Sequence, residues 1–284
     1  MENRYYDKRE VMSRGGRTLS QGRKIQKMVK NGYERSACFK KMLDGLGINP
    51  ADIRSVGDME KLPVITREAL IGLEQKNVPY GGLADDRADV DRIFISPGPV
   101  YEPHLSESNP LWARAYHAAG IGKEDIVLNA FSYHMVAAGL TFHGGLRLVG
   151  ATVVPSGTSG SEMQVHLIRD LKVTAYTGTP SFLMAIIRKA EDLGHDFKKD
   201  FLLRKASFAA EPLLPAVREA FEKRYGIDTY QMYGATEVGD VAYECSAKAG
   251  WHICEEVLVE IVDPQTGKKV PDGQLGEVVV TRFN

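Results

Sequence analysis

Between residues 123 and 225, short apolar runs typical of strands alternate with longer amphipathic stretches typical of helices. Such alternation indicates a mostly parallel sheet flanked by helices, because consecutive parallel strands need a crossover connection between them. The expected strands are 126–130, 151–154, 173–177 and 204–208, and the expected helices are 137–148, 161–171, 213–225 and one that starts at Pro180 after a Thr179 cap. The sequence therefore predicts the α/β fold class.

Composition narrows the kind of protein. The 284 residues are enough for one large domain or two lobes, and 43% hydrophobic with 26% charged residues is typical of a soluble globular protein. The 36 basic and 37 acidic side chains leave a net charge of -1, which gives no general attraction to nucleic acid or to a membrane surface. Three cysteines are too few for a disulfide framework, and neither a signal peptide nor a run of about 18 apolar residues is found. We expect a cytoplasmic protein without nucleic-acid or membrane partners.

Loops that carry glycine or polar residues follow several of the expected strands. In open α/β sheets, the ligand crevice lies outside the carboxyl ends of the strands. The loops at Ser96, Phe131, Gly178 and Ala209 are therefore expected to converge on one rim, with the stretch around Tyr233 as a fifth.

The stretch Tyr-Gly-Ala-Thr-Glu at 233–237 brings several chemistries together. Tyr233 can stack on a flat ring, and Gly234 lets the backbone come close to a ligand. Thr236 can donate a hydrogen bond to a phosphate oxygen, and Glu237 can hold a hard divalent cation. A turn between two strands would use the same residue types, so this stretch alone leaves both interpretations open.

A strand at 91–95 leads into a loop rich in Ser, Pro and Gly at 96–103 and then into an expected helix at 107–119. A strand, such a loop and a helix are a common place for nucleotide phosphates. This loop is a poor phosphate cradle, because its internal prolines donate no backbone N–H and it contains no lysine. A rigid structural turn is at least as good an interpretation.

The two ends of the chain differ from its middle. Residues 20–46 predict a helical entry segment, and Thr66 is expected to cap a second short helix. The strand patterns at 256–262 and 276–281 are separated by tight turns and predict an antiparallel meander.

These patterns predict three parts. They are a helical entry segment at 1–90 packed on the main domain, an α/β core at 91–240, and a β-rich subdomain at 241–284. The chain stops after a strand whose closing partner is unassigned, so we expect the last part to be incomplete.

Cys245, His252 and Cys254 have the spacing C-x6-H-x-C in an expected hairpin. His252 and Cys254 are two apart on a strand and share a face, and the hairpin return can bring Cys245 opposite them. They are candidates for three ligands of a structural, tetrahedral zinc site, with Glu255 or a distant histidine as the fourth. The competing interpretation is two small buried cysteines beside a surface histidine.

With these loops placed, the chain resembles the phenylacetate–CoA ligase branch of the adenylate-forming (acyl-CoA synthetase) superfamily over essentially its whole length. The motifs that carry the resemblance are Gly178-Thr-Pro-Ser-Phe-Leu183, Ala210-Glu-Pro212, Tyr233-Gly-Ala-Thr-Glu237, Glu260-Ile-Val-Asp-Pro-Gln-Thr-Gly267 and Gly276-Glu-Val-Val-Val-Thr281. The resemblance implies the large N-terminal domain of such an enzyme, with the α/β core at 91–240 as its nucleotide- and acid-binding part. It also implies that ATP and a carboxylic acid give an acyl adenylate, from which CoA displaces AMP.

The resemblance implies a role for each matching residue. The implied nucleotide-binding residues are Ser96 and Gly98, the segment Ala209, Ala210, Glu211 and Pro212 along the adenine, Tyr233 stacked on it, and Gly234, Ala235 and Thr236. Thr236, as donor to the α-phosphate, and Glu237, as ligand of Mg²⁺, are the implied catalytic residues. Phe131, Tyr133 and His134, with Gly178 and Thr179, resemble the edge of the acid pocket. In-line attack on the α-phosphate depends mostly on positioning and charge neutralisation.

Two departures from the family pattern keep alternatives open. Glu102 stands where the phosphate loop of the family has a lysine, and the small C-terminal domain with its catalytic lysine is absent before Asn284. We therefore expect this chain to be inactive alone. The alternatives are adenylyl transfer to an acceptor other than CoA, such as a deazaflavin, and a nucleotide-binding pseudo-enzyme. The acid is not specified, and a homodimer is one of the assembly states left open.

Overall fold

A computed structural model of the protein describes residues 5–85, 87–105 and 112–283. The chain forms two compact units. The first consists of Met1–Asp7 and Asn109–Cys254, and the second of Lys8–Ser108 and Glu255–Asn284. These bounds do not coincide with the expected boundaries at 90 and 240, because the C-terminal strands join the N-terminal helices in one unit.

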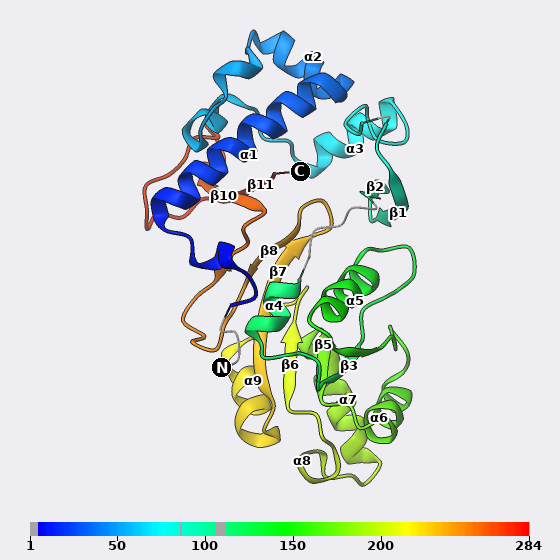
Figure 1. Ribbon diagram of the computed structural model, residues 1–284. Coiled ribbons are helices and arrows are strands. Elements are labelled where there is room, and N and C mark those ends of the chain that lie inside the picture. Colours follow the sequence, from blue (N-terminus) through cyan, green and yellow to red (C-terminus); the bar gives the residue numbers. More distant parts are fainter. Residues whose placement is uncertain (1–4, 86, 106–111, 284) are drawn as a thin grey trace. The chain divides into compact units, whose positions relative to one another are not determined.

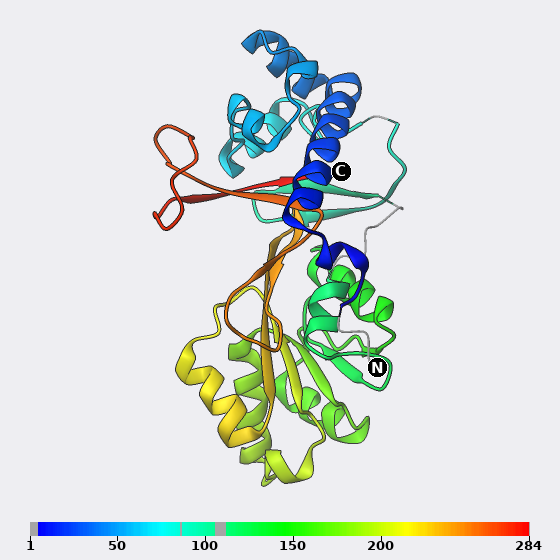
Figure 2. The same ribbon diagram turned by 60° about the vertical axis from the view of Figure 1, so that its left-hand side comes forward.

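The first unit is built on a seven-stranded sheet with strand order β4-β3-β5-β6-β7-β8-β9 (Figures 1 and 2). The strands are β3 (Ile126–Asn129), β4 (Thr152–Val154), β5 (Ala175–Gly178), β6 (Lys205–Phe208), β7 (Asp228–Ala235), β8 (Gly239–Tyr243) and β9 (His252–Ile253). Pairing is parallel from β4 to β7, whereas β8 and β9 are added antiparallel. The predicted α/β class with a mostly parallel sheet is confirmed.

Helices lie on both sides of this sheet (Figure 2). They are α4 (Ala113–Ala118), α5 (Ala138–Leu148), α6 (Ser161–Asp170), α7 (Pro180–Asp192), α8 (Phe197–Asp200) and α9 (Pro215–Glu219), which continues as a π-helical turn over Ala220–Tyr225. Successive strand residues face opposite sides of a sheet. Tyr176 accordingly packs into the apolar cluster that contains Leu128 and Phe208, while Thr177 meets the buried hydroxyl of Tyr116 at 3.0 Å.

The start of α7 follows from its sequence as predicted. Pro180 is its first residue, where the missing backbone N–H leaves no helical hydrogen bond unmade. The side chain of Thr179 accepts a hydrogen bond from the Phe182 N–H and caps the helix.

The second unit contains helices and two separate strand pairs. Its elements are short 3₁₀ turns at Lys8–Val11, Pro50–Asp52 and Val56–Lys61, helices α1 (Arg14–Arg35), α2 (Ala37–Leu46) and α3 (Arg67–Lys76), and strands β1 (Val90–Ser96), β2 (Val100–Leu105), β10 (Val257–Val262) and β11 (Glu277–Arg282). β10 and β11 pair antiparallel, as the sequence predicts, and Leu258 on β10 packs with Ile25 and Val29 of α1.

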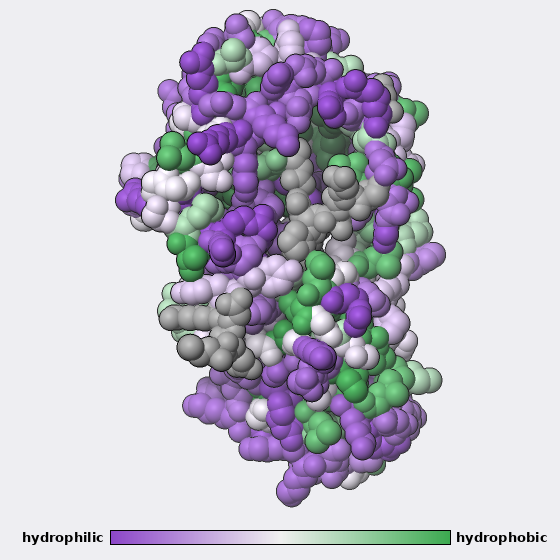
Figure 3. Space-filling view, in the orientation of Figure 1, coloured by the Kyte–Doolittle hydropathy of each residue, from purple (hydrophilic) through white to green (hydrophobic). Residues whose placement is uncertain are grey.

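The helix predicted over 20–46 is two helices. Ser36 adopts an extended conformation, and its side chain accepts a hydrogen bond from the Phe39 N–H, so it ends α1 and caps α2. The outer face of α1 carries exposed Arg23, Lys27 and Lys30, and the surface of α1 and α2 is largely hydrophilic (Figure 3). Among the residues that the structure describes, no helix is long and apolar enough to cross a membrane.

The segment expected to be a strand, a loop and a helix is instead a β-hairpin. β1 and β2 pair antiparallel as a two-stranded sheet, and residues 97–99 form the turn. Residues 100 to 102 alternate between buried and partly buried, which is the period of a strand, and Glu102 lies opposite Phe94. Of the expected helix at 107–119, residues 107–111 lie outside the described residues, and α4 covers Ala113–Ala118.

Candidate nucleotide-binding site

The carboxyl ends of the parallel strands bring four of the expected loops to one edge of the sheet. Because β3, β5, β6 and β7 are neighbours in this order and run parallel, the loops that follow them leave the same edge. These loops contain Phe131, Thr179, Ala209 and Thr236. The fifth loop, with Ser96 and Gly98, belongs to the second unit.

The segment Ala209–Pro212 is anchored at both ends and exposed in its middle. The Ala209 N–H donates to the Gly178 carbonyl on the neighbouring strand at 3.2 Å. At the other end, the Leu213 N–H donates to the side-chain oxygen of Gln231 at 2.9 Å. Ala210, which has φ 70, and the two residues after it are exposed, so the backbone between the anchors lies open to a ligand.

Glu211 provides a third anchor for this segment. Its carboxylate accepts hydrogen bonds from the Ser181 hydroxyl at 2.8 Å and from the Ser181 N–H at 3.3 Å. Ser181 is in the first turn of α7, where free backbone N–H groups favour a negative charge. The carboxylate is therefore engaged in holding the segment.

The stretch 233–237 is the end of a strand and a tight turn, where the sequence predicts a loop. Tyr233 and Gly234 lie within β7, which pairs antiparallel with β8 and has an irregular register between these two residues. The turn contains exposed Thr236 and Glu237. The Tyr233 side chain is 50% exposed although it lies on a strand, which leaves its ring available for stacking. The geometry is thus that of a turn between two strands, with the candidate ligand-binding side chains on its surface.

Gly234 is required by a close contact within the protein. A Cβ at this position would lie 2.2 Å from the Gly239 carbonyl oxygen and 2.6 Å from the Cη2 atom of Trp112. Trp112 is 5% exposed and packs on Phe142 with ring centroids 4.5 Å apart, and Phe142 stacks on Phe131. The lack of a side chain at Gly234 therefore lets the β7 backbone lie close to Gly239 and Trp112 within the protein itself. Sequence reasoning missed Trp112, because it lies in no motif.

The loop after β3 is fixed by a buried amide. The Asn129 side chain donates to the Tyr133 hydroxyl at 2.8 Å and to the Gly139 carbonyl at 2.9 Å. Burial raises the pKa of Tyr133 to about 12, so its phenol is neutral at physiological pH. Phe131 is buried, whereas His134 is exposed at the tip of the loop.

In the second unit, the hydroxyl of Ser96 is engaged by its own hairpin and by the first residue of α3. It donates to the Glu102 carboxylate at 2.7 Å and accepts a hydrogen bond from Arg67 at 2.9 Å. Arg67 also donates to the Pro97 carbonyl at 2.6 Å. The Ser96 hydroxyl and the Pro97 carbonyl of the loop compared with the phosphate loop thus have partners within the second unit, and Glu102 is a buried acceptor on β2.

The structure does not assemble the zinc ligands predicted from the sequence. Across residues 5–85, 87–105 and 112–283, no group of three or more His, Cys, Asp and Glu side chains is arranged to hold a metal ion. His252 pairs with Tyr243 across the β8–β9 hairpin and is exposed, whereas Cys254 is buried and its thiol lies 3.5 Å from Asp240. Cys245 follows β8, beyond the paired residues. The zinc prediction is therefore wrong for this arrangement, because the hairpin register does not bring the three side chains together.

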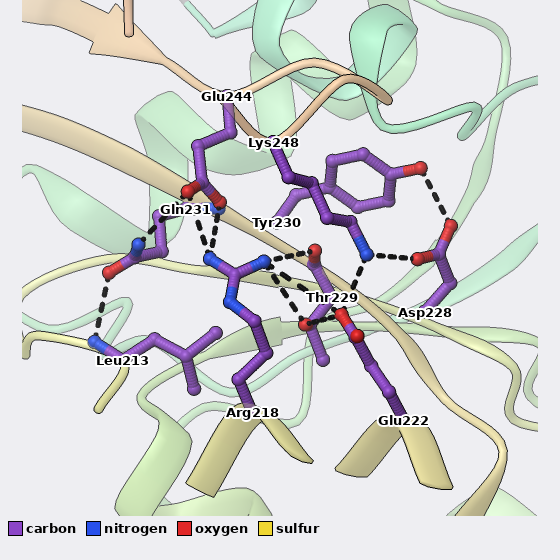
Figure 4. Close-up of polar contacts among 9 residues, drawn as sticks. All are labelled: Leu213, Arg218, Glu222, Asp228, Thr229, Tyr230, Gln231, Glu244 and Lys248. Atoms are coloured by element: carbon purple, nitrogen blue, oxygen red, sulfur yellow. Dashed lines mark hydrogen bonds and ion pairs between the residues drawn. The ribbon is translucent and has the colours of Figure 1, made fainter. Parts of the chain in front are cut away.

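Sequence reasoning also missed the polar group that supports the anchored segment. Gln231 on β7, Glu244 directly after β8, and Arg218 on α9 form one hydrogen-bonded group (Figure 4). The one signal in the sequence was a polar residue between Tyr230 and Met232, and it does not indicate partners 13 and 18 residues away.

Comparison with solved structures identifies the class of fold. A 2-hydroxyisobutyryl-CoA ligase in an open conformation, in complex with 2-HIB-AMP and CoA, matches with a TM-score of 0.91 and 20% sequence identity, over 99% of this chain and 65% of that chain. A benzoate CoA ligase from Burkholderia xenovorans LB400 matches with a TM-score of 0.53 and 20% identity, over 73% of this chain and 44% of that chain. The fold is that of the N-terminal domain of adenylate-forming ligases.

Sequence comparison then identifies the family. The model of the AMP-binding enzyme family matches residues 105–283, and the chain belongs to this family. A phenylacetate-coenzyme A ligase from Aromatoleum evansii is 35% identical over 265 residues, which are 89% of this chain and 59% of that protein. The Escherichia coli K12 enzyme of the same name is 32% identical over 274 residues, which are 92% of this chain and 62% of that protein. The resemblance inferred from the motifs is confirmed, and the chain spans about three fifths of the length of these relatives.

Proposed function

We propose that this protein activates a carboxylic acid with ATP and then transfers the acyl group to CoA. A carboxylate oxygen forms a bond to the α-phosphorus, and the bond from that phosphorus to pyrophosphate breaks. The CoA sulfur then bonds to the acyl carbon, its thiol proton is lost, and AMP leaves. The names of the similar ligases support this reaction, and the family membership supports adenine nucleotide binding.

The observation that carries the proposal is the anchored segment Ala209–Pro212 beside the end of β7. β6 and β7 are paired neighbours, so the exposed backbone after β6 and the exposed ring of Tyr233 leave the same edge of the sheet. An aromatic ring and an open strip of backbone suit a flat base, because the ring can stack and the backbone can form hydrogen bonds. We assign the adenine to this pair.

The remaining site residues fit the chemistry of the reaction. Thr236, exposed on the β7–β8 turn, supplies a hydroxyl donor for the α-phosphate, and Glu237 supplies one carboxylate to Mg²⁺. Mg²⁺ is usually held by one or two carboxylates together with substrate phosphates and water, so a single glutamate suffices, and the bound ion neutralises phosphate charge. The neutral phenol of Tyr133 adds no negative charge that would repel the acid beside Phe131.

Replacement of Tyr233 by alanine is expected to weaken AMP binding about tenfold or more. Removing an aromatic partner of a base costs about 1–3 kcal/mol, and about 1.4 kcal/mol is a factor of ten in affinity. Isothermal calorimetry of the 284-residue chain with AMP, and with a stable acyl-adenylate analogue, measures the change.

Trp251→Ala is the matched control for this prediction. Trp251 is 46% exposed in the β8–β9 connection of the same unit and is not at the carboxyl edge of the parallel strands, so AMP affinity should stay within about twofold. Equal affinities of the wild type and Tyr233→Ala would remove the assigned role of Tyr233. If the wild type bound neither AMP nor the acyl-adenylate analogue, the proposed function would be contradicted.

Because the 284-residue chain is expected to be inactive alone, the reaction itself is tested with a longer chain that includes the small C-terminal domain of the family. The assay is acid-dependent exchange of pyrophosphate into ATP over a panel of aryl and short-chain acids. Exchange followed by a thioester product with CoA supports the proposal. Exchange without any thioester favours transfer of AMP to another acceptor, and nucleotide binding without exchange on any acid favours a pseudo-enzyme.

A further inference from the structure

The side chain of Gln231 links the two parts of the proposed adenine site. Its oxygen accepts the Leu213 N–H at 2.9 Å, and its nitrogen donates to the Glu244 carboxylate at 3.2 Å (Figure 4). This orientation of the amide is the consistent one, because a carboxylate only accepts and an N–H only donates. Gln231 thus ties the end of the segment Ala209–Pro212 to strand β7.

Gln231 and Tyr233 are coupled through the same strand. They are two residues apart on β7, so their side chains leave the same face, and the residues on either side of Gln231 are buried. A movement of β7 that shifted the Tyr233 ring would therefore also pull on the hydrogen bond to Leu213.

Glu244 holds Gln231 rigidly because both of its oxygens are occupied. Arg218 donates to these two oxygens at 2.9 and 2.7 Å, and the backbone N–H of Gln231 donates to one of them at 2.9 Å. Glu244 is 7% exposed, and Arg218 is held in turn by the Thr229 carbonyl at 3.1 Å. A buried, satisfied network of this kind specifies one arrangement of the groups it contains.

We propose that Gln231 is a positioning residue for the nucleotide. It sets the spacing between the Tyr233 ring and the backbone of Ala209–Pro212, so that the adenine is held between a stacking face and a fixed strip of backbone. This inference rests on the proposed function, because it assigns a task to the same site.

Replacement of Gln231 by methionine, which is similar in length but lacks both hydrogen-bonding groups, tests the inference. We expect the Kd for AMP to rise about tenfold, since the freed Leu213 N–H no longer fixes the segment and about 1.4 kcal/mol is a factor of ten. The preference for AMP over GMP, measured as the ratio of their Kd values by calorimetry, should fall several-fold, because the strip of backbone no longer matches the base edge.

Lys248→Met is the matched control. Lys248 lies beside the group of Gln231, Glu244 and Arg218 and forms ion pairs with Glu222 and Asp228, but it has no hydrogen bond or ion pair with Leu213 or Glu244 (Figure 4). If the network served stability alone, Lys248→Met and Gln231→Met would both change Tm, and both would leave the ratio of the Kd values for AMP and GMP at its wild-type value. Positioning by Gln231 predicts that the ratio changes in Gln231→Met alone.

Hydrogen exchange of the Leu213 amide supplies a measurement that needs no variant. If Gln231 couples this amide to the site, AMP must slow its exchange in the wild-type chain, because a ligand stabilises the arrangement that it binds. Unchanged exchange with AMP bound, or an unchanged Kd ratio in a folded Gln231→Met chain, would overturn the inference. If the wild type binds no AMP, it is the proposed function that fails.

Discussion

Replacement of Arg218 by methionine is expected to lower the free energy of unfolding of the first unit by about 3–5 kcal/mol, because it leaves a buried carboxylate without its cation. The Arg218 and Glu244 side chains are 19% and 8% exposed, and they meet at 2.7 Å. The loss also removes the contact of Arg218 with the Thr229 carbonyl. Urea unfolding followed by circular dichroism measures the change.

The control for Arg218→Met is Arg224→Met in the π-helical turn that continues α9. Arg224 pairs with Glu191 at 2.8 Å, but the two side chains are 66% and 35% exposed, so the pair should contribute no more than about 1 kcal/mol. Similar losses in the two variants would contradict the view that burial of Glu244 makes its pair important. A double variant that also replaces Glu244 by leucine should recover part of the stability, because it removes the unpaired charge.

Replacement of Gly234 by alanine is expected to cost about 1–3 kcal/mol of stability and to weaken AMP binding severalfold. The added methyl would meet the Gly239 carbonyl oxygen at 2.2 Å and Trp112 at 2.6 Å. The first of these atoms is backbone of the paired strand, so relief requires β7 and β8 to separate beside Tyr233. Thermal unfolding and AMP calorimetry of the same preparation measure both effects.

Gly144→Ala is the control for Gly234→Ala. Gly144 is exposed on α5, and a Cβ added there would meet no atom within 4 Å. Alanine is favoured over glycine in a helix interior by about 0.5–1 kcal/mol, so this variant should be neutral or slightly more stable. If Gly234→Ala kept the stability and the AMP affinity of the wild type, glycine would not be required at this position.

Much of the fold could be predicted because it depends on patterns among residues that are near one another in the chain. The alternation of strands and helices predicted the parallel sheet, and Thr179 with Pro180 predicted the start of α7. The predictions that proved wrong needed information from elsewhere in the chain. The helical spacing of apolar residues continues across Ser36, so the end of α1 was missed. The strand at 100–105 was missed because the Ser, Pro and Gly residues before it favoured a loop.

For the candidate site, too, some features could be predicted from the sequence and others could not. Its residue types and the order of its loops could be taken from the sequence, since strand ends and family-like motifs are local features. The group of Gln231, Glu244 and Arg218 could not, because each member is an ordinary polar residue until the strand register brings it to the others. The same register keeps Cys245, His252 and Cys254 apart, although their spacing fits a metal site.

The sequence by itself determined the α/β class, the strand-end loops and the residue types of the stretch 233–237. Only the tertiary structure showed that this stretch is a strand end and a turn, that Gly234 is required by Trp112 and Gly239, and that Gln231 joins it to the anchored backbone at Leu213. The physical reason is that propensity, capping and periodicity act between residues near one another in the chain. Contacts between distant residues depend on strand register and burial, which are settled when the whole chain packs.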